Sequence, residues 1–247
     1  MLAIIGGSGL TRLSTLAVAH REVVRTPYGE PSSALVFGQI AGRDAIFLAR
    51  HGHGHTIPPH RVNYRANLWA LKARGATEVL AVASVGGIRN AQPGELVLPH
   101  QLIDYTHDRE ATFFDGGDQR VMHIDFTHPY TLTLREKCLA AAKAAGIGLI
   151  DGGVYGAVSG PRLETVAEID RMERAGATLV GMTGMPEAAL AREIELPYAA
   201  IAVVVNHAAG RGDSAVQISM ERIAEVLETA MGRVRILLEH VAALETP

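Results

Sequence analysis

The stretch LARHGHGHTIPPHRVNY, residues 48–64, holds four histidines within ten positions, His51, His53, His55 and His60. Histidines at this density could bind a metal ion or an anion. A zinc site needs three or four ligands that converge in a fixed geometry. Here the intervening glycines predict a loop, and neither an H-E-x-x-H motif nor a cysteine accompanies the histidines.

Arg50, directly before His51, favours an anion over a metal ion. A guanidinium is permanently charged and would repel a bound dication. The same side chain offers an anion two parallel N–H groups, and an imidazole adds another donor. We therefore predict an anion site, and a metal site is the alternative.

Two further motifs offer hydroxyl or backbone donors. IIGGSG, residues 4–9, fails the dinucleotide fingerprint because Arg12 replaces its third glycine, and no G-x-x-x-x-G-K-[ST] loop is present. This segment could bring Ser8 to an anion or be only a tight turn. In VGMTGMPEAALARE, Thr183 could join the same anion site, whereas Glu187 could serve only the dipole of the helix that it opens.

Alternating strands and helices must position these residues. Apolar runs predict strands at 2–6, 44–49, 78–84, 153–158, 178–182 and 198–205. Helical spacing predicts helices at 62–74, 130–145, 164–175, 186–195 and 217–242. Gly146 and Gly176 stand where helix C-terminal caps belong. Neither a repeat nor a linker is apparent, so we predict one α/β domain over residues 1–247.

The unusual polar residues fall where predicted strands end. In open α/β sheets, ligands gather at the carboxyl ends of the strands. The segments at such ends are Gly6–Gly9, Arg50–His51, Ser84, Met182–Thr183 and Asn206–His207. Their coincidence predicts one composite site.

Composition excludes several classes of protein. The net charge of −3 gives no general attraction to nucleic acid or to anionic membranes. The single cysteine, Cys138, cannot form an intrachain disulfide and fits a reducing compartment. The N-terminus lacks the features of a signal peptide, and the apolar run at 198–205 is too short to span a bilayer. We expect a cytoplasmic protein without nucleic-acid or membrane partners.

Together, IIGGSGL, LARHGHGHTIPPHRVNYRANLWALK, GPRLETVAEI and MTGMPEAALARE resemble the trimeric purine nucleoside phosphorylases, most closely their methylthioadenosine phosphorylase branch. The resemblance covers nearly the whole chain. It implies a three-layer sandwich around a central mixed β-sheet, usually as a homotrimer (or a dimer of trimers). It also implies phosphorolysis of a purine nucleoside, with inorganic phosphate as co-substrate and neither cofactor nor metal.

The resemblance assigns residues position by position. Those matching phosphate-binding positions are Ser8, Arg50, His51, Ala83, Ser84 and Thr183. Those matching substrate-binding positions are Met182 along the ribose, Asn206 and Ala208 at the base, Leu163 in place of the usual Phe, and His123, which reaches a neighbouring subunit's site. Asn206, His51 and Arg50 are expected to be catalytic. His53, His55 and His60 are expected to be structural.

Two positions bear on the substrate, one that departs from the resembled branch and one that agrees with its apolar residue. The branch carries D-x-D where this chain has Asn206–Ala208. An amide can donate to a 6-oxo group and accept from N7–H, whereas a carboxylate only accepts. Met220 stands where 6-oxopurine enzymes have a histidine for the 5′-hydroxyl, and Ile223 could line the same pocket. A thioether suits apolar Met220, so the expected substrate is 5′-methylthioinosine.

Other readings stay open. Gly181 replaces an asparagine of the relatives, which leaves details of the base pocket undecided, and Met220 could be ordinary core. Methylthioadenosine or inosine and guanosine are alternative substrates within the family. Outside it, a metal-dependent hydrolase would need no phosphate, and a nucleoside-binding protein would not catalyse.

Overall fold

The computed structural model describes residues 1–116 and 120–244 and contains one mixed β-sheet flanked by helices. The strands of this part are β1 (Leu2–Gly6), β2 (Ala17–Glu22), β3 (Leu35–Ile40), β4 (Arg43–Ala49), β5 (Glu78–Gly87), β6 (Leu96–Leu98), β7 (Gln101–Asp104), β8 (Leu149–Asp151), β9 (Val154–Ala157), β10 (Leu179–Gly181) and β11 (Tyr198–His207). The α-helices are α1 (Tyr64–Ala73), α2 (Leu132–Ala145), α3 (Val166–Arg174), α4 (Gly184–Glu193) and α5 (Met220–Ala243). Short 3₁₀ helices cover Pro59–Arg61 and Gly212–Ser214.

The central strand of the sheet is β5. It pairs in parallel with β1 and β11, and its last two residues pair antiparallel with β10. Along the sheet the order runs β2-β3-β4-β1-β5-β10-β9-β7, and β6 and β8 extend it beyond β11. β1 and most of β5 and β11 are buried, as expected for strands covered on both faces.

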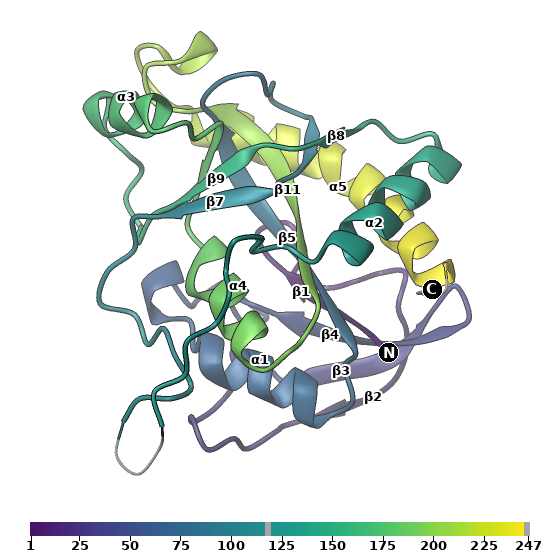
Figure 1. Cartoon of the computed structure of the whole chain (residues 1–247). Coiled ribbons are helices and arrows are strands. Elements are labelled where there is room, and N and C mark those ends of the chain that lie inside the picture. Colours follow the sequence, from purple (N-terminus) through teal and green to yellow (C-terminus); the bar gives the residue numbers. More distant parts are fainter. Residues whose placement is uncertain (117–119, 245–247) are drawn as a thin grey trace.

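Helices cover both faces of the sheet, which makes three layers (Figure 1). One apolar core packs α1 and α4 against the sheet and includes Leu68 and Leu190. A second core packs α2 and α5 and includes Leu134 and Val234. The predicted three-layer α/β sandwich with a mixed sheet is therefore confirmed.

The predicted helices are present, with local signals at their ends. Thr165 and Glu168 form a reciprocal capping box at the start of α3. Ser219 accepts a hydrogen bond from the Arg222 N–H at the start of α5. Gly146 and Gly176 adopt positive φ angles of 65° and 98° after α2 and α3, as the cap prediction required. Of the helices described, none is long and apolar enough to cross a membrane.

The strands differ from the sequence prediction in two ways. β2, β6, β7 and β8 were not predicted, because they are short or, as in β2, mostly exposed and without an apolar pattern. β3 was missed although its residues are apolar and mostly buried. β5 also continues to Gly87, so Ser84 lies within the strand and not at its end. The composite site thus lies partly over the face of β5.

Candidate active site

A cavity of about 640 Å³ opens over β5 and the loops around it. This volume lies in the range of small-molecule sites. Eleven of the thirteen predicted site residues line it, namely Ser8, Arg50, His51, Ala83, Ser84, Leu163, Met182, Thr183, Asn206, Met220 and Ile223. The sequence prediction therefore selected residues from segments far apart in the chain that the fold brings together in one cavity.

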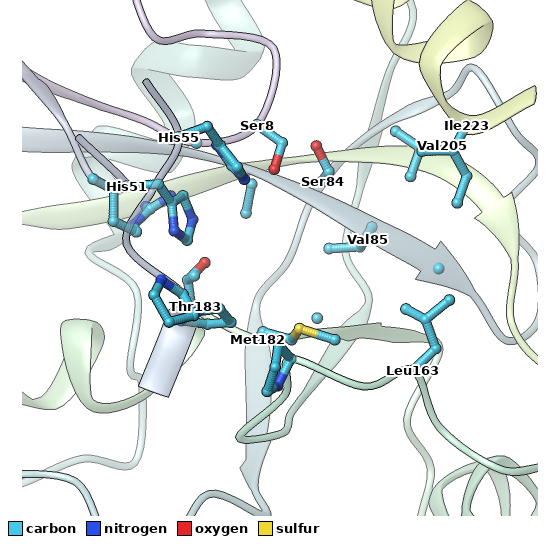
Figure 2. A pocket seen from close by; sticks show the side chains of 18 of the residues that line it. Ser8, His51, His55, Ser84, Val85, Leu163, Met182, Thr183, Val205 and Ile223 are labelled. Carbon is cyan, nitrogen blue, oxygen red and sulfur yellow. The ribbon is translucent and has the colours of Figure 1, made fainter. Parts of the chain in front are cut away.

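The cavity has a polar end and an apolar end. Figure 2 shows Ser8, His51, His55 and Thr183 gathered at one end and Leu163, Val205 and Ile223 at the other. Ser84 lies between them, and its buried Oγ has no hydrogen-bond partner in the described part of the chain. An unpartnered hydroxyl in a cavity is available to a ligand.

Arg50 is held by a carboxylate before any ligand arrives. Its Nε and Nη2 each lie 2.7 Å from the Glu187 carboxylate, and Nη1 donates to the Val82 carbonyl at 2.9 Å. Arg50 and Glu187 are each 1% exposed. The bidentate edge expected to clasp an anion is therefore occupied by Glu187, which does more than serve a helix dipole. One N–H on each terminal nitrogen is left for a ligand.

His51 is fixed in one tautomer by the loop that carries it. Its Nδ1 lies 2.8 Å from the Ile57 carbonyl, which can only accept, so Nδ1 bears the proton. Burial, and then the charge of Arg50, lower the pKa of His51 from its ordinary 6.5 to about 4. The neutral ring thus offers a ligand an acceptor at Nε2, not the donor that the sequence suggested. It can receive a hydrogen bond from a phosphate hydroxyl.

The other histidines of the loop have different surroundings. His55 also lines the cavity, with its ring 4.6 Å from that of His51, and burial lowers its pKa. His53 faces a second, separate cavity, and His60 is exposed. Within the described ranges, no three His, Cys, Asp or Glu side chains are grouped to hold a metal ion.

A β-bulge positions Asn206. The pairing of β11 with β5 shifts between Val204 and Asn206, and Val205 is the extra residue. As a result, the consecutive residues Val205 and Asn206 both line the cavity. The Asn206 Nδ2 donates to the His207 carbonyl at 2.6 Å, which leaves Oδ1 as an acceptor and one N–H as a donor.

Two predicted residues do not line the cavity. Ala208 is buried, and its backbone N–H bonds the Gly87 carbonyl, so it lies beyond the bulge and packs in the core under α3. His123 is exposed on the segment before α2. The roles assigned to Ala208 and His123 remain predictions.

The structure adds residues that the sequence prediction omitted. Glu164, on the loop between β9 and α3, lines the cavity beside Leu163, and burial raises its pKa. Its position directly after Leu163 in GPRLETVAEI could have suggested it. Gly181 also has an explanation, because a Cβ there would lie 2.1 Å from the Tyr155 hydroxyl. The asparagine of relatives cannot fit in this geometry.

The segment between β11 and α5 is tied at both ends by a link that consists of His207, Asp213 and Arg222. Asp213 lies 2.6 Å from His207 Nδ1 and 3.1 Å from the Arg222 guanidinium. A Cβ at Gly212 would lie 2.5 Å from the His207 ring, so only glycine allows this approach. The link holds the end of β11 close to the first turn of α5, where Met220 and Ile223 line the cavity.

Comparisons with known proteins give related chains throughout. A model of the phosphorylase superfamily matches residues 1–243. A probable S-methyl-5′-thioinosine phosphorylase of Pseudomonas syringae is 53% identical, covering 97% of each chain. A probable 6-oxopurine nucleoside phosphorylase of Thermococcus kodakarensis is 41% identical, covering 96% of this chain and 90% of the relative. The solved methylthioadenosine phosphorylase of Schistosoma mansoni, in complex with adenine, superposes with a TM-score of 0.94 at 32% identity, covering 98% of this chain and 90% of the other.

Proposed function

This chain belongs to the phosphorylase superfamily, and from that membership we propose that it is a purine nucleoside phosphorylase acting on S-methyl-5′-thioinosine. The products are hypoxanthine and 5-methylthioribose 1-phosphate. The observation that carries the proposal is a single cavity lined by an amide, a carboxylate and an apolar pair, Asn206, Glu164, Met220 and Ile223.

Asn206 and Glu164 match the hydrogen-bonding groups of a 6-oxopurine. Hypoxanthine carries an acceptor at O6 and donors at N1–H and, when it leaves, N7–H. The Asn206 amide has one free N–H and a free Oδ1, which suit O6 and N7–H. Glu164, when ionised, accepts from N1–H. Adenine has no N1–H and carries a 6-amino donor, so it leaves mismatched polar groups in the site.

Met220 and Ile223 suit a sulfur-bearing sugar. Both lie in the first turn of α5 and line the cavity. A methylthio group is soft and apolar, and contact with Met and Ile side chains costs it no hydrogen bond. A 5′-hydroxyl placed there would lose its bonds to water without replacement.

The polar end of the cavity suits phosphate. A phosphate oxygen attacks C1′ of the sugar while the bond from C1′ to N9 breaks and its electrons pass to the purine. The purine takes up a proton at N7 from water, and the new sugar phosphate releases one to water. Positive charge develops on the sugar, and the phosphate beneath it provides both nucleophile and counter-charge. Ser8, Ser84 and Thr183 provide hydroxyl donors, and His51 Nε2 accepts from the phosphate hydroxyl. Arg50 adds its two free N–H groups.

The proposal includes a homotrimer (or dimer of trimers) in the cytoplasm that uses phosphate and needs neither cofactor nor metal. Exposed apolar side chains just before and at the start of α5 support assembly, since Val216 is 99% exposed and Met220 59%. His123 would then reach the cavity of a neighbouring copy. Sedimentation equilibrium tests the assembly, and a monomeric mass would contradict it.

The test of function is release of free base from methylthioinosine, methylthioadenosine and inosine, each with and without phosphate. We expect rapid, phosphate-dependent cleavage of methylthioinosine. Preference for methylthioadenosine would contradict the role given to Asn206 and Glu164, and preference for inosine that of Met220. Cleavage without phosphate, abolished by a chelator, would instead indicate a metal-dependent hydrolase.

A further inference from the structure

The guanidinium of Arg109 does not line the cavity but binds two of the chain segments that do. Arg109 Nη1 lies 2.9 Å from the Met182 carbonyl and 2.5 Å from that of Met185. Its Nη2 lies 2.8 Å from the Ser159 carbonyl and 3.3 Å from that of Val158. Arg109 thus joins two chain segments at their backbones.

These two segments carry much of the cavity lining. The turn from β10 to α4 provides Met182 and Thr183, and the loop from β9 to α3 provides Leu163 and Glu164. The carbonyls that Arg109 binds have directions set by the planar guanidinium, so its removal frees both loops at once. A lysine could not reach the same four acceptors from one point.

Arg109 also has no carboxylate partner among the described residues. Its acceptors are neutral, including the hydroxyl of Tyr64, 3.3 Å away, whose pKa burial raises. The adjacent Asp108 and Glu110 bind His107 and Arg65 instead. Arg50, by contrast, is neutralised by Glu187. In the described ranges, then, no carboxylate pairs with the charge of Arg109, and one of its hydrogen bonds goes to Met182, the neighbour of Thr183.

We propose that Arg109 is a positioning residue for phosphorolysis, which holds the Met182–Thr183 turn against the Val158–Ser159 loop and adds a positive charge, paired with no carboxylate of the described residues, behind the phosphate. This inference rests on the proposed function. It adds positive potential to that of Arg50, part of which the Glu187 carboxylate offsets. Electrostatic attraction of this kind acts through a low-dielectric protein wall more strongly than through water.

The variants Arg109→Met and Arg109→Lys separate geometry from charge. We expect Arg109→Met to raise the KM for phosphate on the order of tenfold and to lower kcat, since both charge and fixed geometry are lost. In Arg109→Lys the KM for phosphate should return most of the way to the wild-type value, because the charge is kept, while kcat stays low. Arg65→Met is the matched control, because Arg65 binds Thr112 and Glu110 of the same segment away from the cavity. It should stay within about twofold of wild type.

Phosphate titration by calorimetry keeps the two proposals separable, because it needs no turnover. If wild type binds phosphate but cleaves no nucleoside, the proposed function fails while the effect of Arg109 on phosphate can still be measured. Phosphate affinity and kcat in Arg109→Met within twofold of wild type would overturn the inference. Should Arg109→Met not fold, Arg109→Lys alone still tests the inference, because lysine keeps the charge but not the geometry. A wild-type kcat in Arg109→Lys would overturn the geometric role. A loss of phosphate affinity as large as the loss of kcat would overturn the role of charge.

Discussion

Asn206 is oriented before any substrate is present. Its Nδ2 is bonded to the neighbouring carbonyl and its backbone lies at a bulge, so the free Oδ1 and the remaining N–H have fixed directions. A preoriented amide loses little side-chain entropy on binding. Discrimination between bases then depends on which hydrogen bonds a base can complete.

Asn206→Asp should shift the base preference toward 6-aminopurines. A carboxylate cannot donate to O6 and leaves that oxygen unpaired. We expect kcat/KM for methylthioinosine to fall on the order of a hundredfold, and the ratio of methylthioadenosine to methylthioinosine cleavage to rise. Asn206→Ala serves as the control, because it removes both hydrogen bonds without favouring either base. An unchanged ratio in Asn206→Asp would contradict the assignment.

His51 should make the folded state sensitive to acid. In the unfolded chain it binds a proton near its ordinary pKa of 6.5, but in the folded chain only near about 4. The unfolded state therefore binds more protons between these values, and stability falls as the pH drops from 6.5 to 4. The loss attributable to this residue is on the order of 3 kcal/mol.

Urea unfolding of wild type and His51→Gln at several pH values measures this effect. The variant should lose less stability than wild type over the same range. Equal losses in the two proteins would contradict the buried, neutral state of His51.

Single residues were predicted from the sequence when they lay in short motifs. Ser8, Arg50, His51 and Thr183 were found in this way, and the cavity brings them together. The pairing of Arg50 with Glu187 was not predictable, because 137 positions separate them. Arg109 was missed for a similar reason, since its acceptors are backbone carbonyls that leave no trace in residue types.

The link of His207, Asp213 and Arg222 ties the first turn of α5 to the end of β11. The hydrogen bond from His207 Nδ1, with the charges of His207 and Arg222, lowers the pKa of Asp213 and keeps it ionised. The first turns of α5 are otherwise poorly buried, and the buried residues of this helix begin only at Ala230. The position of Met220 and Ile223 therefore depends on this link.

Asp213→Asn should weaken selection of the 5′ group. Loss of the charge loosens the hold on Arg222, so we expect KM for methylthioinosine to rise severalfold while kcat for inosine changes little. Asp151→Asn is the control, because it breaks a comparable pair with Arg135 and neither of these residues lines the cavity. An equal effect of both variants on methylthioinosine would indicate only a loss of stability.

Most elements were predictable in proportion to their apolar pattern, and the buried strand β3 is the exception. β1, β5 and β11 and the five helices have continuous or periodic apolar residues, and the sequence located them. β2 has mainly exposed residues, and β6 and β8 have three residues each. Their pairing is decided by neighbouring strands and not by their own residues.

The two layers of helices are joined to the sheet by charged as well as apolar contacts. Lys137 of α2 lies 2.6 Å from the carboxylate of Glu78 at the start of β5, with both side chains under 10% exposed. A charge buried here without its partner would be costly.

Lys137→Met should therefore destabilise the whole fold. We expect a loss of about 3–5 kcal/mol in the free energy of unfolding, because the substitution breaks a buried ion pair from one side. Urea unfolding measures it, and Lys143→Met on the exposed face of the same helix should change stability by no more than about 0.5 kcal/mol. Restoration of stability by Glu78→Gln in the Lys137→Met background would identify the broken charge pair as the cause.

The cavity takes its lining from stretches that are widely separated in the chain. Asn206 stands on β11, Glu164 on the loop before α3, and Met220 on α5. Mutation can therefore alter one portion of the pocket and spare the others. Under the proposed function, substitution at Asn206 could change the specificity for the purine without changing that for the sugar. Substitution at Met220 could change the specificity for the sugar without changing that for the purine. Diversification of substrates within the fold needs only a few independent steps, taken in either order.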